Sequence, residues 1–333
     1  MRTLSSTAAF ALLAACSGGG SPPPAVAVGV AGLNQTARPR VARSHVTPFV
    51  NVARIKAQHG NHTFVTDAGT ATVTVWGANG QLNAILFDGI NAVPEGLATD
   101  AAQNLYVANL NYSNVIVYAK PYTSINRTLD DAGQETEDVA VDKTGLVGVT
   151  NYLTSSLEPG SVSFFAKNAT QPCTVVQDPN WVYFFNDAFD ASGNLFIDGL
   201  TAAGSTLVGE VSGGCRATSI TTLSVGNTIS WPGGVQVSDG AILIGDVNKQ
   251  AIYTYAPPLS GSLGSPTAVT TLAGAETPVT FAIEENGKHV RTADAAADKL
   301  YAALYTYPKG SYVSKLADHL WAVAVAVYPP ARP

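Results

Sequence analysis

The sequence predicts an all-β fold, a six-bladed β-propeller, from three observations. A pattern of strand, Asp/Gly/Asn turn and second strand returns along the chain, and no stretch beyond the N-terminus keeps a helical period. An apolar strand without a partner also follows the last copy of the pattern. A repeat of about 40 to 50 residues is typical of a four-stranded propeller blade.

Six copies are recognised by the residue that closes the second strand of each, and successive markers lie 42 to 48 residues apart. The markers are Asp67, Asn109, Asn151, Gly199, Asp246 and Asp294. The turns inside the copies support hairpins, as in Asp142–Gly145 and Asp190–Gly193. Asp bonds its own backbone two residues on, and Gly adopts the positive φ that a tight hairpin needs.

The two ends of the repeat region predict how the ring closes. The first copy, at Phe64–Asp67, has no convincing first strand upstream, whereas the apolar run Trp321–Val327 is left over. We expect a C-terminal strand at about 320–327 to complete the first blade, so that the propeller occupies 49–329. An open ring would leave two unpaired edges. The alternative, a loose apolar tail, would invite aggregation.

The N-terminus has the layout of a secretory signal, with a basic Arg2 and a short apolar stretch. Leu13–Cys16 resembles the bacterial lipobox, which implies cleavage after residue 15 and acylation of Cys16. The Gly/Ser/Pro-rich stretch that follows suits a flexible tether over 16–48. The resemblance implies a lipid-anchored protein of the bacterial cell envelope. In bacteria with two membranes, Ser17 after the acylated cysteine implies the outer membrane.

Composition limits the partners. Only 13% of the residues are charged, and the net charge is −6 without a basic cluster, which argues against nucleic acid. We expect a monomer that meets the membrane only through its lipid anchor. An envelope protein, a glycan or a small molecule remains as the partner class.

Two cysteines remain beyond Cys16, namely Cys173 and Cys215. An exported protein permits a disulfide between them. Both are expected after the third strand of neighbouring blades, near the rim where blades splay apart. A disulfide needs Cα atoms within about 7 Å, so two separate buried thiols are slightly favoured.

Ligands of a propeller usually meet the mouth of the central channel, and the segments entering each blade supply polar residues there. These candidates are Glu95, Glu137, Asp138, Asn186, Asp187 and Trp231. Converging carboxylate and amide oxygens could bind Ca²⁺ or share a proton. The alternative is that they cap strand starts and face water.

Two family resemblances follow from these segments. Pro94–Ala108 nearly reproduces the Pro-x-Gly-Leu-Ala-x-Asp-x-x-Gly-Asn-Leu-Tyr-Val-Ala pattern, so the chain resembles NHL-repeat propellers over roughly 60–328. Their motif specifies turns and strands and no reaction, and those propellers are mostly binding modules. Asn186–Phe196 is similar to a blade of the gluconolactonase and senescence-marker-protein family.

The second resemblance implies a metal-dependent lactone hydrolase whose metal is held by a Glu, two Asn and an Asp. Glu95 and Asn186 match the first two positions, whereas Gly234 and Thr280 stand at the others. Two of four ligands are therefore missing. The sequence thus predicts a non-catalytic binding or scaffold module at the cell envelope. The alternative is a lactone or ester hydrolase with a degenerate metal site.

Overall fold

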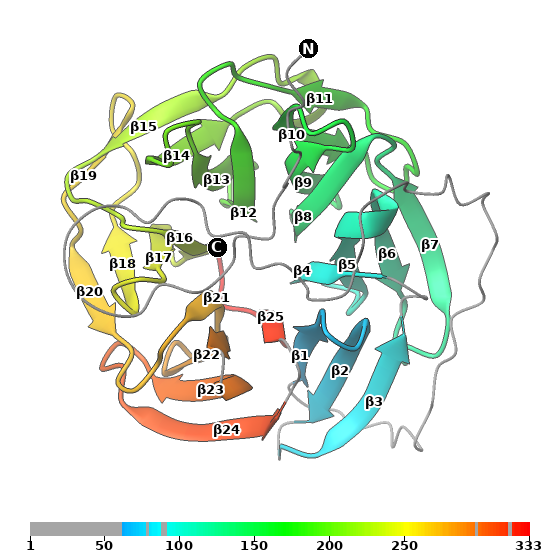
Figure 1. The fold of residues 1–333 in the computed structure, drawn as a ribbon, viewed down its shortest axis with the longest axis vertical. Helices are drawn as coiled ribbons and strands as arrows, with labels where there is room; N and C mark the ends of the chain where they lie inside the picture. The colour runs from blue at the N-terminus through cyan, green and yellow to red at the C-terminus, as the bar shows by residue number, and fades with distance from the viewer. Residues whose placement is uncertain (1–61, 78–79, 88–91, 297–298, 319–321) are drawn as a thin grey trace, which may run out of the picture.

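The chain forms six sheets around a central axis, and the strands of each blade run antiparallel (Figure 1). The computed structural model describes residues 62–77, 80–87, 92–296, 299–318 and 322–333. The predicted signal peptide, Cys16, the tether and Trp321 lie outside the described residues. No helix of the described part is long and apolar enough to cross a bilayer.

The first three blades follow the chain in order, apart from the strand that closes the ring. Blade 1 contains β25 (Ala322–Tyr328), β1 (His62–Asp67), β2 (Thr72–Gly77) and β3 (Leu82–Phe87). Blade 2 contains β4 (Pro94–Thr99), β5 (Leu105–Asn109), β6 (Asn114–Tyr118) and β7 (Ile125–Asp130). Blade 3 contains β8 (Gln134–Val141), β9 (Val147–Thr154), β10 (Pro159–Phe165) and β11 (Thr174–Val176).

The last three blades include one inserted strand, β19, which leaves blade 5 and pairs in parallel with the outer strand of blade 4. Blade 4 contains β12 (Tyr183–Phe189), β13 (Leu195–Leu200), β14 (Thr206–Val211) and β15 (Thr221–Val225), extended by β19 (Ser262–Gly264). Blade 5 contains β16 (Pro232–Ser238), β17 (Ala241–Asp246), β18 (Ala251–Tyr255) and β20 (Ala268–Thr271). Blade 6 contains β21 (Pro278–Ile283), β22 (His289–Ala296), β23 (Lys299–Thr306) and β24 (Tyr312–Asp318).

Hydrophobic layers between neighbouring blades form the core. In β5, Leu105 and Val107 pack with Phe64 of blade 1, whereas Tyr106 and Ala108 pack with Val149 of blade 3. This alternation is the two-residue period of a strand that is buried on both faces. Each blade therefore depends on both neighbours for its stability.

The C-terminal strand closes the ring as the sequence predicts. β25 is the innermost strand of blade 1 and pairs antiparallel with β1, with Ala326 opposite Phe64. The Thr66 hydroxyl accepts the Ala324 N–H at 2.7 Å, beside a bulge in β1. β25 also contacts blade 6 through Thr280, whose hydroxyl donates to Val323 O and accepts the Val325 N–H, each at 3.2 Å.

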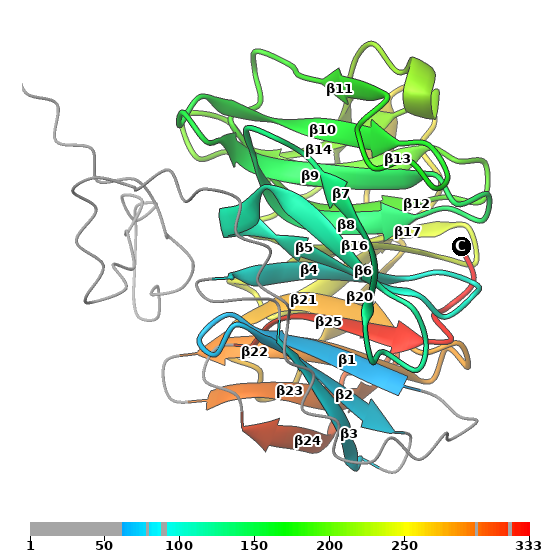
Figure 2. The same cartoon turned by 90° about the vertical axis from the view of Figure 1, so that its right-hand side faces the viewer.

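The disc has two distinct faces. We call the side where the innermost strands begin the mouth face, and the side where they end the tail face. Figure 2 shows the disc from its edge, with the C-terminus on the side toward which the β25 arrow points. On this tail face Ala331 N–H donates to Ile283 O, and Asp239 N–H donates to Arg332 O.

A disulfide joins blades 3 and 4, so the expectation of two separate thiols is wrong. Cys173 and Cys215 are bonded, with their Cα atoms 5.3 Å apart. Cys215 lies in the short 3₁₀ turn η2 (Gly214–Arg216), which contacts β10 and β11 of the neighbouring blade. The turn thus spans the gap that splaying of the outer strands would otherwise leave.

Candidate functional site

Two hollows lie along the axis. The channel cavity, of about 240 Å³, is lined by the innermost strands of the blades and by the C-terminal residues Pro330 and Ala331. Toward the mouth face lies a smaller space of about 20 Å³, which we call the mouth hollow. Its polar and aromatic lining consists of Glu95, Glu137, Asp138, Phe185, Asn186, Trp231 and Thr280.

Bulges near the starts of the innermost strands place these side chains. The pairing register shifts between Pro94 and Leu97 in β4, and between Phe184 and Asp187 in β12. A bulge bends a strand and re-aims its side chains. Glu95 and Asn186 lie within these bulges, and β8 has register shifts on both sides of Thr136. The Thr150 hydroxyl fixes the β12 bulge by donating to Phe185 O at 2.6 Å.

Gly96, which follows Glu95 on β4, lets Asp138 of β8 pack close to Glu95 across blades 2 and 3. A Cβ on Gly96 would lie 2.0 Å from Asp138 Oδ1, so only glycine allows the Asp138 carboxylate to pack there. Glu95 is 7% exposed, and burial followed by the Asp138 charge raises its pKa to about 8. Burial and the neighbouring charge therefore disfavour the charged form of Glu95 at neutral pH.

Asp138 and Glu137 lie next to each other on β8 and are both partly buried. Asp138 accepts the Val139 N–H at 2.8 Å and the Asp187 N–H at 3.2 Å. Burial nevertheless raises the pKa of Asp138 to about 7. The pKa of Glu137 is also raised, first by burial and then by the charges of Glu95 and Asp138.

Asn186 is held by a residue that the sequence analysis missed. Asp198 Oδ1 accepts both the backbone N–H of Asn186, at 2.9 Å, and its side-chain Nδ2–H, at 3.0 Å. Asp198 is fully buried, and burial raises its pKa to about 7. One signal in the sequence could have indicated Asp198. It is the only carboxylate in the otherwise apolar strand Leu195–Leu200, one position before the marker Gly199.

Asp187 lines the channel cavity and not the mouth hollow. It is 5% exposed, and neither carboxylate oxygen has a hydrogen-bond partner among the described residues. Burial, then the charges of Asp138 and Asp198, raise its pKa. The structure thus gathers the predicted acidic residues of blades 2 to 4 at one end of the channel.

An aromatic wall borders the mouth hollow. Tyr152 stacks on Tyr183 at a centroid distance of 4.9 Å and contacts Phe185 at 5.6 Å, and Phe185 contacts Trp231 at 6.2 Å. Phe184, the neighbour of Phe185 on β12, does not belong to the wall, because it is fully buried and stacks on Trp181 in the core. Among the described residues, the wall therefore consists of Tyr152, Tyr183, Phe185 and Trp231.

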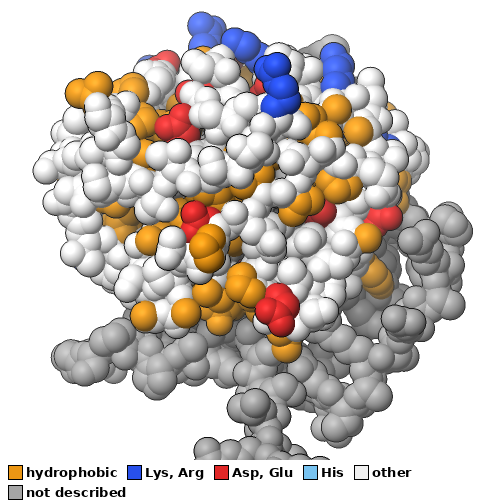
Figure 3. Space-filling model, turned by 90° about the horizontal axis from the view of Figure 1, so that it is seen from above, with side chains coloured by type: hydrophobic (Ala, Val, Ile, Leu, Met, Phe, Trp, Pro, Cys, Tyr) orange, Lys and Arg blue, Asp and Glu red, His pale blue; other side chains and the backbone are white. Residues whose placement is uncertain are grey.

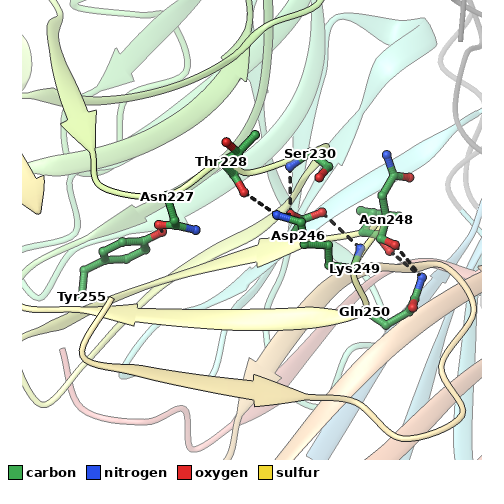
Figure 4. A network of polar contacts seen from close by, with 9 residues as sticks. Asn227, Thr228, Ser230, Asp246, Asn248, Lys249, Gln250 and Tyr255 are labelled. Carbon is green, nitrogen blue, oxygen red and sulfur yellow. Dashed lines mark hydrogen bonds and ion pairs between the residues drawn. The ribbon is translucent and has the colours of Figure 1, made fainter. Parts of the chain in front are cut away.

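A hydrogen-bond network holds the loop just before Trp231, and Figure 4 shows Thr228, Ser230, Asp246 and Lys249 of this network. Asp246 accepts the Ser230 N–H at 2.8 Å and the Lys249 N–H at 3.2 Å, and Lys249 Nζ donates to Thr228 O at 2.6 Å. The Trp231 carbonyl in turn accepts the Val247 N–H at 3.1 Å. The loop before β16 is thus anchored on both sides of the aromatic residue.

The residues present do not fit the metal site that the lactonase resemblance implies. Gly234 has φ +80°, and a Cβ there would lie 2.9 Å from Phe281 Cδ1, so no ligating side chain fits without displacing the ring. The Thr280 hydroxyl is occupied by its two bonds to β25. Within the described part of the chain, no three His, Cys, Asp or Glu side chains group as metal ligands.

Comparison with known proteins supports the fold and gives no family. No family model matches the chain, and no curated protein matches it. The structure is similar to a six-bladed propeller in the crystal structure of a nidogen/laminin complex, with TM-score 0.63 and 16% identity over 80% of this chain and 98% of that one. It is also similar to a Bacteroides caccae protein of unknown function, with TM-score 0.61, 10% identity and the same coverages.

Proposed function

We propose that this chain is an exported, lipid-anchored propeller that binds a ligand at its mouth face without transforming it. The observation that carries the proposal is the mouth hollow, where buried carboxylates lie beside an aromatic wall. Gly234 and Thr280 serve packing and ring closure at the two positions where a lactonase would need metal ligands. The site can therefore recognise a ligand but lacks a complete metal centre.

Two further observations support the proposal. The Cys173–Cys215 disulfide is of a kind that persists in oxidising compartments outside the cytoplasm, as the lipobox resemblance implies. The similar propeller of the nidogen/laminin complex belongs to a protein assembly. Because one fold hosts many functions, that similarity supports a binding role only as an analogy.

Binding is tested with a thermal-shift and calorimetric panel of envelope glycan fragments, peptides, organic acids and organic amines. We expect at least one class to bind the wild-type chain and to lose affinity in Trp231→Ala. Trp231 lines the hollow and is only partly buried, so its truncation removes a contact surface while leaving the core intact. Binding that survives in Trp231→Ala with unchanged affinity would place the site elsewhere.

The hydrolase alternative is tested on the same protein with a panel of lactones and esters in Ca²⁺, Mg²⁺, Mn²⁺ or Zn²⁺. We expect no turnover above that of the buffer. Metal-dependent turnover that is lost in Glu95→Gln would reject the non-catalytic proposal.

Lipid attachment at Cys16 is tested by labelling cells with radioactive palmitate. We expect the label to be incorporated into the wild-type protein and not into Cys16→Ser.

A further inference from the structure

Glu95 has no hydrogen-bond or ion-pair partner in the mouth hollow among the residues that the structure describes. Its side chain is 7% exposed, lines the hollow and accepts no hydrogen bond from any residue that the structure describes. Within the same described residues, no Lys, Arg or His forms an ion pair with Glu95, Glu137 or Asp138. A buried carboxylate without donors is costly, and the described residues supply Glu95 with neither hydrogen-bond donors nor a positive charge.

The size of the hollow restricts what can supply them. About 20 Å³ is room for one group the size of a water molecule. A primary ammonium group has about that size and brings three N–H donors, as in Lys. A trimethylammonium group is larger and donates no hydrogen bond.

The aromatic wall suits the remainder of such a ligand. Phe185 and Trp231 line the hollow together with the carboxylates, and Tyr152 and Tyr183 continue the wall from Phe185. Glu137 and Phe185 line the same hollow, and Tyr152 contacts Phe185. Burial, followed by the Glu137 charge, raises the pKa of Tyr152. Aromatic faces attract cations and pack against apolar groups.

On the mouth face, Lys249 of blade 5 is held by Asp246 and Thr228 O, and the Lys and Arg residues of blades 3 and 4 lie on the other face. Lys143, Lys167 and Arg216 lie in turns of the tail face, away from the hollow. Figure 3, another edge view, shows the visible Lys and Arg side chains near the top of the view, with Asp and Glu side chains both among and below them. The mouth face of blades 2 to 4 therefore presents its carboxylates to a ligand without competing cations from these turns.

We propose that the mouth hollow binds the primary ammonium group of an organic amine, with Glu95, Glu137 and Asp138 around the cation and the apolar part of the amine against the aromatic wall. This inference rests on the proposed function and specifies its ligand class. It involves no chemical step on the amine.

Proton release accompanies binding. The carboxylates that face the cation are Glu95 of β4 and Glu137 and Asp138 of β8, with Asp187 and Asp198 of blade 4 behind them. A bound cation favours their charged forms, so affinity rises with pH as Asp138 and Glu95 ionise, between about 7 and about 8. An alkyl ammonium stays charged through this range, because its pKa is near that of Lys, about 10.

The probe is 2-phenylethylamine, titrated calorimetrically into the full chain purified in neutral detergent. Its N-acetyl derivative keeps the aromatic group and loses the charge, and its N,N,N-trimethyl derivative keeps the charge and loses the donors. We expect the amine to bind and both derivatives to bind at least roughly tenfold more weakly. Equal binding of either derivative, or no binding of the amine, overturns the proposal.

Glu95→Gln is the deciding variant and Glu158→Gln its matched control. Glu158 is an exposed carboxylate in the β9–β10 turn of the mouth face and does not line the hollow. We expect Glu95→Gln to weaken amine binding by roughly 30-fold or more and Glu158→Gln to leave it unchanged. Unchanged binding in a folded Glu95→Gln variant overturns the proposal.

A measurement on the wild type alone covers the case in which Glu95→Gln does not fold. The affinity for 2-phenylethylamine between pH 6 and 9 should rise with pH and then level off, and a flat profile overturns the proposal.

Different results would reject the ammonium inference and the proposed function. A glycan that binds through Trp231 while the amine does not would reject only the ammonium inference, whereas lactone turnover lost in Glu95→Gln would reject the binding function itself.

Discussion

The carboxylate of Asp246 accepts the backbone N–H of Ser230 at 2.8 Å, immediately before Trp231. The same relationship recurs in blade 6, where Asp294 Oδ1 accepts the Thr277 N–H at 2.8 Å, and in blade 2, where Asn109 Oδ1 accepts the Val93 N–H at 3.0 Å. In blades 2, 5 and 6, the residue that closes the second strand thus holds the loop that enters the blade. This explains why Asp or Asn stands at these three positions, whereas Asn151 of blade 3 donates to the Ser161 and Ser163 hydroxyls instead.

Asp246→Asn should destabilise the protein by about 1 to 3 kcal/mol, because the two carboxylate oxygens accept two different backbone N–H groups and an amide can replace only one of them. Urea unfolding measures the change. Asp239→Asn is the matched control, since Asp239 is exposed, and it should stay within about 0.5 kcal/mol of wild type. Equal stabilities of the two variants would contradict the capping role of Asp246.

Gly234→Asn should lower stability and create no metal site, although it restores the residue type that the lactonase pattern has there. Asparagine tolerates the positive φ of Gly234, but its Cβ would meet Phe281 at 2.9 Å. We expect a loss of about 1 to 3 kcal/mol in urea unfolding.

Gly204→Asn separates this clash from backbone strain. Gly204 has nearly the same φ, +78°, but its Cβ would have no neighbour within 4 Å. The control should therefore be clearly more stable than Gly234→Asn. Similar losses in the two variants, or metal binding gained by Gly234→Asn in calorimetry, would contradict the packing explanation.

The disulfide between blades 3 and 4 closes a loop with a sequence separation of 42 residues. By the chain-entropy model, a loop of this length stabilises the fold by about 4 kcal/mol. Replacing Cys173 and Cys215 together by Ser should lower the free energy of unfolding by about 2 to 4 kcal/mol. Adding a reductant should then lower the wild type to the level of the double variant, while a reductant without effect on the wild type would contradict a stabilising bridge.

The fold could be predicted because its determinants are local and repeated. Turn residues such as Gly145 and Gly193 adopt the positive φ that hairpins require, +89° and +87°. The partner of the apolar C-terminal strand could be predicted because the first copy of the repeat was the one without a first strand. In the structure β25 occupies that position in blade 1. Hydrophobic period and turn chemistry determine such features within a few residues of each other in the sequence.

The site was harder to predict because it depends on contacts between blades. The repeat pattern places Glu95 and Asn186 at the entrances of their blades, but it assigns no role to Asp198, which holds Asn186 from the next strand. The Cys173–Cys215 distance depends on how far η2 folds over its neighbour, and no local pattern encodes that. Thr280 gives no sign of its bonds to β25, because its partners are backbone groups more than 40 residues away.

Stability should fall as pH rises from 5 to 8, because buried carboxylates of the site bind protons more tightly in the folded chain than in the unfolded one. The folded pKa of Asp198 is about 7, above its ordinary value of 3.8. Its contribution is present in full below about pH 4 and is lost as pH rises through 7. The neighbouring Asp138 and Glu95, with pKa values of about 7 and about 8, act in the same direction.

Asp198→Asn isolates one part of this dependence, because its amide oxygen can still accept the Asn186 N–H. The free energy of unfolding of the wild type should decrease between pH 5 and 8 by on the order of 2 to 3 kcal/mol more than that of the variant. Asp239→Asn, which changes an exposed carboxylate, should keep the wild-type slope. Parallel pH profiles for the wild type and Asp198→Asn would show that Asp198 is ionised in the folded protein, with Asn186 and its backbone stabilising the charge.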